Sequence, residues 1–450
     1  MMRLIWINFL RAGVVKLGLP LLLLVSLMAI LVGRQFNERQ NESIQEAAQL
    51  QQHQLHRHAQ NFKDEIGYML YYAKFALVNA PSPIGGFSIG QRDVNPTIMA
   101  LTIRNIESQK YDADLSNPYN QMIGNIDFSF VLIFLFPLLI VAFTYSLLSE
   151  EQESGTWNLV LIQSRNAGGV LLLLLSVRVL LVSALFALLS FIASIILHAG
   201  FGVFFWKFVS GGLLYILMWF SFCFCVISFQ KSSSFNALIL LSFYLLLLIV
   251  LPGLINNYLE NKYPVPEALE VTVKQRKAYH EKWDMDHGPT MDKFFVHYPQ
   301  FRHYTIPDTD FSWPVYYAMQ QMGDDESAVY SKALKKRLEE RNVATRKISR
   351  FVPPLHLQLQ LNTLAKSDME NHLHFLEAAT AFHEKIRLHF YPKIFEGDAS
   401  TSEDWRVWKE EYFEGDTSVT WAQLLLPLII FTLLFTGITG RRFGQQAGRK

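Results

Sequence analysis

The chain has 450 residues, of which 51% are hydrophobic and 18% are charged, and its formal net charge is +1. This near-neutral balance lacks the basic excess of a nucleic-acid-binding protein, so no nucleic-acid partner is expected. The apolar residues are gathered into long runs, which is typical of a membrane protein rather than of one large soluble core. Both cysteines, Cys223 and Cys225, lie in one such run, so we expect no disulfide in the polar segments.

The N-terminal part of the chain predicts a membrane anchor that continues into a polar helix. Residues 1–16 carry polar side chains in one sector of a helix, which is typical of an interfacial helix. Residues 17–33 form the first apolar run, and no small-residue cleavage site follows it, so we interpret it as an uncleaved span. Residues 35–80 have helically spaced apolar positions and predict an amphipathic extension of this span.

Five further apolar runs are long enough to cross a bilayer core, which needs about 20 residues. They are residues 128–148, 178–198, 201–227, 235–254 and 419–439. Lys and Arg lie near one set of span ends, and the positive-inside rule assigns that side to the cytoplasm. The fold expected is therefore an all-α membrane protein with six transmembrane helices and two large, mainly helical extracytoplasmic insertions, with both termini cytoplasmic.

The expected division of the chain follows from these runs. It comprises residues 1–33, 34–126, 127–255, 256–418 and 419–450. Within the second insertion, charged helices are predicted over residues 271–282 and 324–350, the second ended by Pro353-Pro354. Residues 357–390 predict two helices that divide near Ser367-Asp368, where Asp368 suits a helix cap.

The segment between the second and third spans, residues 150–165, is the stretch of the sequence that indicates most about function. An acidic run is followed by a short apolar helix and by basic residues, with Arg178 expected to open the third span at the cytoplasmic boundary. So short a helix can hardly bury itself, and its charges are expected to find no partner within the loop. This pattern suits docking on a second protein below the membrane.

The sequence Glu-Glu-Gln-Glu-Ser-Gly-Thr-Trp-Asn-Leu-Val-Leu of residues 150–161, followed by Ser164-Arg165 and Arg178, resembles the coupling segment of ABC type-2 exporter permeases. The chain has Gln163 where that family usually has Pro. Residues 117–131 and 353–375 are similar to a subfamily with two large extracytoplasmic loops.

The resemblance implies a permease subunit of an ATP-binding-cassette exporter in the bacterial inner membrane. Its partners would be a cytoplasmic ABC ATPase dimer, a second permease subunit and membrane lipid. No cofactor, metal site or catalytic residue is expected in this chain, which has no P-loop motif; ATP and Mg²⁺ would be bound by the ATPase. The ATPase-coupling residues would be Glu150, Glu151, Glu153, Gly155, Thr156, Trp157, Leu159, Arg165 and Arg178.

Other functions remain open at this point. The two insertions suit a relay of ATP-driven force to a periplasmic protein, without passage of substrate. A signalling or assembly protein and an enzyme on a membrane anchor fit less well. Residues 86–90 match G-x-S-x-G, but the flanking Pro-Ser-Pro and Gln-Arg-Asp favour a loop over a nucleophile elbow. His53 and His56 can share a helical face that a metal could use, but exposed or capping histidines are the favoured interpretation.

Overall fold

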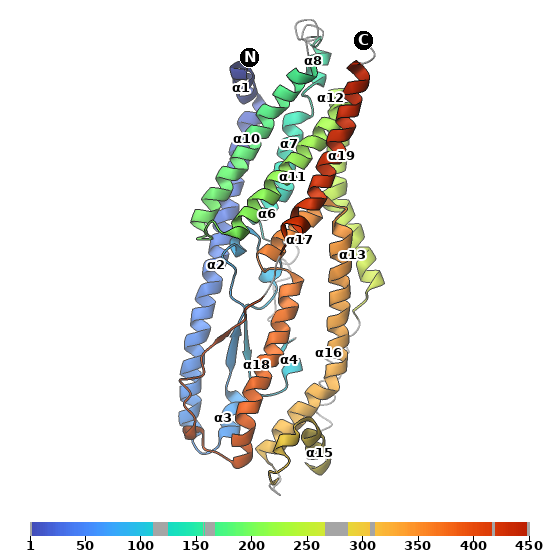
Figure 1. The fold of residues 1–450 in the computed structure, drawn as a ribbon. Coiled ribbons are helices and arrows are strands. Elements are labelled where there is room, and N and C mark those ends of the chain that lie inside the picture. Colours follow the sequence, from blue (N-terminus) through green and yellow to red (C-terminus); the bar gives the residue numbers. More distant parts are fainter. Residues whose placement is uncertain are drawn as a thin grey trace.

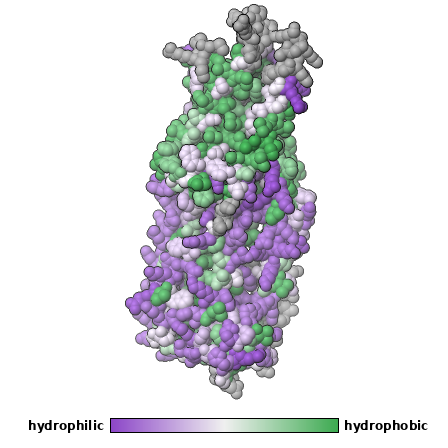
Figure 2. All heavy atoms as spheres, in the orientation of Figure 1, coloured by the Kyte–Doolittle hydropathy of each residue, from purple (hydrophilic) through white to green (hydrophobic). Residues whose placement is uncertain are grey.

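Six of the described helical segments are long and apolar enough to cross a membrane, which confirms the predicted all-α membrane fold. Their bounds are Gly13–Asn61, Phe128–Glu153, Gly169–Ile196, Val203–Ile227, Ser233–Lys262 and Trp421–Arg442. The computed structural model describes residues 2–110, 125–155, 157, 167–265, 287–306, 311–415 and 419–447. The apolar helices form a bundle at one end of an elongated molecule, and a polar body forms the other end (Figures 1 and 2).

The bundle consists of α1 (Met2–Arg11), α2 (Gly13–Asn61), α6 (Phe128–Phe130), α7 (Phe136–Thr144), α8 (Ser149–Glu153), α10 (Ala167–Ile196), α11 (Val203–Ile227), α12 (Ser233–Leu245), α13 (Leu251–Lys262) and α19 (Trp421–Ala447). The second and fifth spans contain π-helical segments, η3 (Val131–Leu135) and η4 (Leu246–Val250), respectively. In both spans a proline occupies the start of the next helical segment, and its missing N–H explains why the regular hydrogen-bond ladder is interrupted there.

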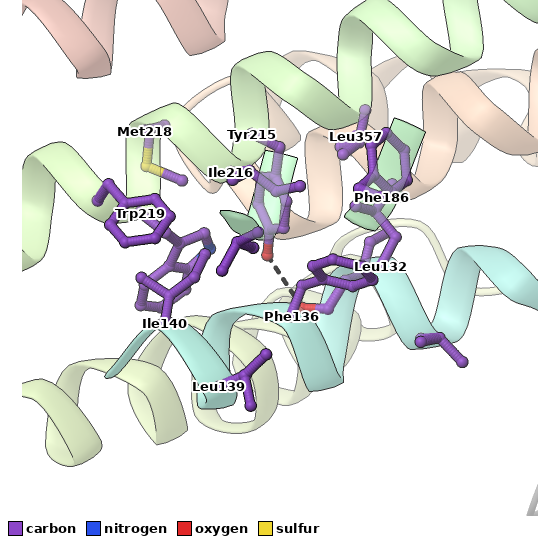
Figure 3. Packing of buried hydrophobic residues seen from close by; sticks show 14 of the residues in the cluster. Leu132, Phe136, Leu139, Ile140, Phe186, Tyr215, Ile216, Met218, Trp219 and Leu357 are labelled. Atoms are coloured by element: carbon purple, nitrogen blue, oxygen red, sulfur yellow. Dashed lines mark hydrogen bonds between the residues drawn. The ribbon is translucent and has the colours of Figure 1, made fainter. Parts of the chain in front are cut away.

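Helix α11 lies at the centre of the bundle. Tyr215 and Trp219 are fully buried in the same apolar core as Phe136 and Phe186 of the neighbouring spans (Figure 3). The Tyr215 hydroxyl donates to the carbonyl of Ile133 at 3.0 Å, which satisfies a backbone group of the π-helical segment η3. Outside this core, leucines such as Leu17 and Leu433 are more than half exposed. An apolar surface of this kind suits contact with lipid chains.

The body is built from both insertions. The first contributes the outer part of α2, α3 (Ile66–Tyr72), β1 (Phe75–Val78), η1 (Gly85–Phe87), η2 (Gly90–Asp93), β2 (Ile98–Leu101) and α4 (Ile106–Lys110). The second contributes α15 (His287–His297), η5 (Pro299–Phe301), α16 (Trp313–Ser349), α17 (Pro353–Leu364), α18 (Met369–Glu396), η6 (Ser400–Ser402) and β3 (Glu411–Tyr412). Apolar side chains from both insertions share one core, so the body is a single packed unit.

A small sheet joins the two insertions. Its strand order is β2-β1-β3, with β1 antiparallel to β2 and parallel to β3. In this register, Phe75 lies opposite Leu101 and Leu77 lies opposite Glu411. The sequence pattern does not predict these strands. Strand β1 is buried along its whole length, so it has no polar alternation that would distinguish it from helix.

Several predicted boundaries need correction. Helix α2 ends at Asn61, well before residue 80, because the chain turns back and Phe62 stacks on Tyr72 of α3, with ring centroids 5.5 Å apart. Helix α16 begins at Trp313, earlier than residue 324. The predicted helix over residues 271–282 lies outside the described residues.

The predicted division of the last two body helices is confirmed. Helix α17 ends at Leu364 and α18 begins at Met369, and the Asp368 side chain accepts a hydrogen bond from the Asn371 N–H at 3.2 Å. This bond satisfies one of the free N–H groups at the start of α18.

Candidate functional site

The acidic segment after the second span lies at the end of the bundle where α1 begins and α19 ends, opposite the tip of the body (Figure 1). Glu150, Glu151 and Glu153 belong to α8, and Gly155 follows it. The structure also describes Trp157. Of the remaining predicted coupling residues, Thr156, Leu159 and Arg165 lie outside the described residues, and Arg178 is considered below.

Glu153 fastens α8 to the start of α12. Its Oε1 accepts a hydrogen bond from the Ser233 N–H at 2.8 Å, and its Oε2 accepts from Ser233 Oγ at 3.2 Å. Ser149 Oγ and Ser233 Oγ are 2.7 Å apart and also share a hydrogen bond. A carboxylate is favourable here because the first turn of a helix presents unpaired N–H groups and partial positive charge. The sequence predicted no partner for the acidic side chains within the loop, and the partner of Glu153 indeed lies outside it, on α12.

Arg178 forms a second link, within the bundle. It lies inside α10, which runs over Ala167–Ile196, so the prediction that Arg178 opens the third span is wrong. Its Nε donates to the carbonyl of Phe143 at 2.8 Å, and its Nη1 donates to the carbonyl of Leu174 at 2.8 Å. The guanidinium also lies over the ring of Phe9, 4.6 Å from the centroid. Arg178 thus connects α1, α7 and α10 through donors that face carbonyls and an aromatic ring.

Trp157 and Gly155 have different surroundings. Trp157 is half-buried and packs against the apolar core of the bundle, whereas the sequence suggested a side chain directed at a partner. Gly155 is exposed and has φ +76°, a left-handed conformation that glycine adopts without the strain of a Cβ. The turn at Gly155 ends α8 and redirects the chain.

A buried polar junction joins the other end of the second span to the body. Asp127 caps α6: its Oδ1 accepts from the Phe130 N–H at 2.7 Å, and its Oδ2 accepts from the Ile89 N–H at 2.8 Å. Ser88 Oγ donates to Asn362 Oδ1 of α17 at 2.7 Å. Gln358 Nε2 donates to Asn362 Oδ1 at 2.8 Å as well. This junction was missed, although an Asp directly before an apolar run is a helix-start signal.

The junction also explains the G-x-S-x-G stretch. The hydroxyl of Ser88 is hydrogen-bonded to Ser129 and Asn362, and neither side chain can act as a base toward it. Gly86 lies against α2 so closely that a Cβ on Gly33 would be 2.1 Å from the Gly86 carbonyl oxygen. The stretch is therefore a packing element between α2 and the second span.

Arg92 reinforces this region from the side of the body. It is buried, and its guanidinium donates to Gln40 of α2, to Asn79 and Ala80 after β1, and to the carbonyl of Lys366 after α17, at 2.8 to 3.1 Å. Burial lowers the pKa of Arg92 to about 10, so the side chain remains charged at neutral pH. Its neutral partners satisfy every N–H direction and fix α2 to the turn between α17 and α18.

Among the described residues, no group of three His, Cys, Asp or Glu side chains is placed to hold a metal ion. His58, which lies near the end of α2, packs between Phe62 and Tyr72, with ring centroids 6.0 Å and 5.8 Å away. Burial lowers its pKa.

The fold and these contacts define a multi-pass α-helical membrane protein whose bundle is tied to a large two-insertion body. A family model described as a domain of unknown function (DUF3526) matches residues 269–413, which span α15 to β3. No curated protein and no solved structure matches the chain.

Proposed function

We propose that this chain is the transmembrane subunit of an ATP-binding-cassette exporter, with both termini in the cytoplasm of a bacterial inner membrane. A separate ATPase dimer would bind ATP and Mg²⁺, and a second permease subunit would complete the complex. The observation that carries the proposal is the position of the acidic α8 segment. It lies at the end of the bundle where α1 begins and α19 ends, and it is hydrogen-bonded to the start of α12.

The contacts around α8 indicate how a push on this segment would spread. A displacement of α8 would move α12 through the bonds of Glu153 to Ser233. The same displacement acts on α7, which Arg178 links to α10 and α1. Closure of an ATPase dimer below the membrane would therefore tilt several spans together. Rigid, hydrogen-bonded elements are the usual carriers of such coupling.

A second function, relay of ATP-driven force to a periplasmic protein, is favoured by a different observation. Helix α2 has 49 residues and is uninterrupted from the bundle to the far end of the body, a length of roughly 74 Å. The Asp127 junction and Arg92 fix this helix, the second span and α17 to one another. A displacement of the spans would be transmitted along α2 to the tip of the body with little reduction in amplitude.

The proposed partnership is tested by purification of the full-length chain from its native membrane in mild detergent. We expect a P-loop ATPase and a second permease subunit to co-purify. Glu151→Lys should lower recovery of the ATPase roughly tenfold, the effect of a lost interfacial charge contact worth about 1.4 kcal/mol. Lys231→Glu, in the turn at the same end of the bundle, is the matched control for a reversed charge. Purification without an ATPase, or equal recovery with both variants, would refute the proposal.

Export and force relay are separated by a second pair of variants. Gln358→Leu combined with Asn362→Leu removes the side-chain bonds of α17 to the junction while the spans are unchanged. Gln360→Leu on the same helix is the control. Under force relay, the double variant loses activity but retains the ATPase; under export, movement of substrate into inverted vesicles persists. Ser242→Trp, on the exposed side of α12, should have the opposite effect. Under export it should block the movement of substrate, and under force relay activity should persist.

A further inference from the structure

A cavity of about 700 Å³ lies in the body between α16, α18 and α4. This volume is within the range of roughly 300–1,000 Å³ typical of small-molecule sites. Its walls are mainly apolar, with side chains from all three helices: Ile106, Ala328, Leu338, Leu373 and Leu376. The cavity is distinct from the acidic segment and the junction, and neither proposed function uses it.

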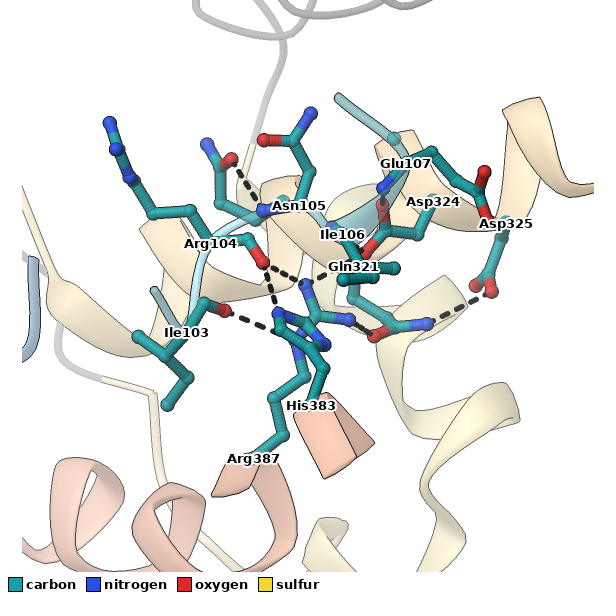
Figure 4. Close-up of polar contacts among 12 residues, drawn as sticks. Ile103, Arg104, Asn105, Ile106, Glu107, Gln321, Asp324, Asp325, His383 and Arg387 are labelled. Carbon is teal, nitrogen blue, oxygen red and sulfur yellow. Dashed lines mark hydrogen bonds and ion pairs between the residues drawn. The ribbon is translucent and has the colours of Figure 1, made fainter. Parts of the chain in front are cut away.

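The floor of the cavity is a buried ion pair whose polar atoms are already engaged. Arg387 and Asp324 are 2.8 Å apart, and Arg387 also donates to Gln321 and to the carbonyls of Ile103 and Arg104 (Figure 4). Asp324 accepts from two backbone N–H groups of α4, each at 3.1 Å. Burial opposes the charge of Arg387, but the nearby tyrosines and Asp324 raise its pKa above the ordinary value.

The neutral state of His383 completes the floor. Burial lowers the pKa of His383 well below its ordinary value, and its Nε2 lies 2.6 Å from the carbonyl of Arg104. A neutral imidazole that donates to this carbonyl adds no charge to the cavity. The polar groups of the floor are therefore fixed and already have hydrogen-bond partners. A ligand would gain its affinity from the apolar walls.

Charged side chains line the rim of the cavity. Its carboxylates are engaged: Glu107 pairs with Lys110 at 2.7 Å, Asp325 with His297 at 3.0 Å, Glu377 with Lys335, and Glu384 accepts from the Tyr298 hydroxyl at 2.7 Å. Lys332, by contrast, is exposed and forms no ion pair with any described residue. An anionic group at the mouth would complement this ammonium.

We propose that the cavity binds a single-chain amphiphile with an anionic headgroup. The apolar chain would lie against Leu338, Leu373 and Leu376, and the headgroup would meet Lys332 at the rim. One chain is favoured because the volume is that of a small-molecule site. The proposal goes beyond the function proposed above, since binding requires neither an ATPase nor transport.

The experiment uses the full-length chain in nanodiscs and palmitic acid that carries a terminal diazirine. After irradiation, mass spectrometry locates the labelled peptides. We expect label on the parts of α16 and α18 that line the cavity. Ala328→Trp fills the cavity and should lower this label roughly tenfold, the effect of excluding about two methylene groups from an apolar wall. Val329→Trp, on the adjacent and 70% exposed position outside the cavity, is the matched control.

The headgroup is tested with a second pair of variants. Lys332→Glu should lower the label, whereas Lys336→Glu, also exposed but not part of the cavity lining, should not. These two substitutions are at exposed positions, so folding is retained even if Ala328→Trp destabilises the body. Label restricted to the spans, or equal loss within either pair of variants, would overturn the proposal.

Discussion

At the scale of single residues, the buried Arg92 and Arg387 and the half-buried Arg178 link separate elements, and two of these three do so without a carboxylate. Arg92 and Arg178 donate to amide or carbonyl oxygens, and only Arg387 has an acidic partner, Asp324. The planar guanidinium suits this role because its five donors point in fixed directions. Sequence patterns of opposite charge cannot reveal Arg92 or Arg178, since the acceptors are main-chain atoms and amides that any sequence supplies.

His372 gives the body a predicted sensitivity to acid. Burial lowers its pKa from 6.5 to about 4, and its Nδ1 is buried without a hydrogen-bond partner among the described residues. The unfolded chain therefore takes up a proton below pH 6.5 before the folded chain does. The contribution of His372 to the free energy of unfolding is therefore fully present above pH 6.5 and is lost as the pH falls toward 4. The loss is about 2 kcal/mol at roughly pH 5.

The measurement is thermal unfolding of the full-length protein at about pH 7.5 and pH 5, with His372→Gln beside the parent. Asp93 and Asp324, whose pKa values are raised by burial, act in the opposite direction. They are present in both proteins and cancel in the difference. We expect the substitution to make stability less dependent on pH. An identical pH dependence in the two proteins would contradict the role assigned to His372.

At the scale of elements, the hydrogen bond from Glu153 to α12 is expected to stabilise the first turn of α12. Glu153→Ala removes the acceptor of the Ser233 N–H and leaves the first turn of α12 less stable. The expected loss is about 0.5–2 kcal/mol, the usual effect of removing a side chain that caps a helix. Hydrogen exchange of the Ser233–Phe235 amides should accelerate accordingly, while Gln152→Ala leaves it unchanged. If both variants exchange alike, α8 and α12 are not linked through Glu153.

The elements also divide into those that the sequence could predict and those that it could not. The spans were predictable because apolar runs of this length are not stable when exposed to water. The start of α18 was predictable because Asp368 is a strong local helix cap. The end of α2 depends on the stacking of Phe62 on Tyr72 after a reversal of the chain, which no local pattern encodes.

The candidate site was only partly predictable for a related reason. The acidic run of α8 was visible as a motif, but the partner of Glu153 lies on another span, and the carbonyl partners of Arg178 become available only when α7 and α10 pack. The strands of the body were not predictable, because β1 pairs with β3 across most of the chain.

At the scale of the whole molecule, the proposed orientation predicts which surfaces meet the outside. Single cysteines at Ser43 and Lys336, both exposed in the body, should react with a membrane-impermeant maleimide on intact cells. Cysteines at Gln152 and Gln446 should react only after permeabilisation. The native Cys223 and Cys225 are buried, and replacing both with Ala removes their background. Labelling of position 152 on intact cells would invert the proposed topology.

The sharing of one core between the two insertions constrains the order in which the protein is made. Gln51 of α2 donates to the carbonyl of Trp408, a residue 357 positions later, and β1 receives its parallel neighbour only when Glu411 has been synthesised. Until then the growing chain exposes the apolar faces of α2 and α3 and an open strand edge, surfaces prone to aggregation. The segment 269–413, expressed by itself, would lack β1 and α4 and would not fold as a separate domain.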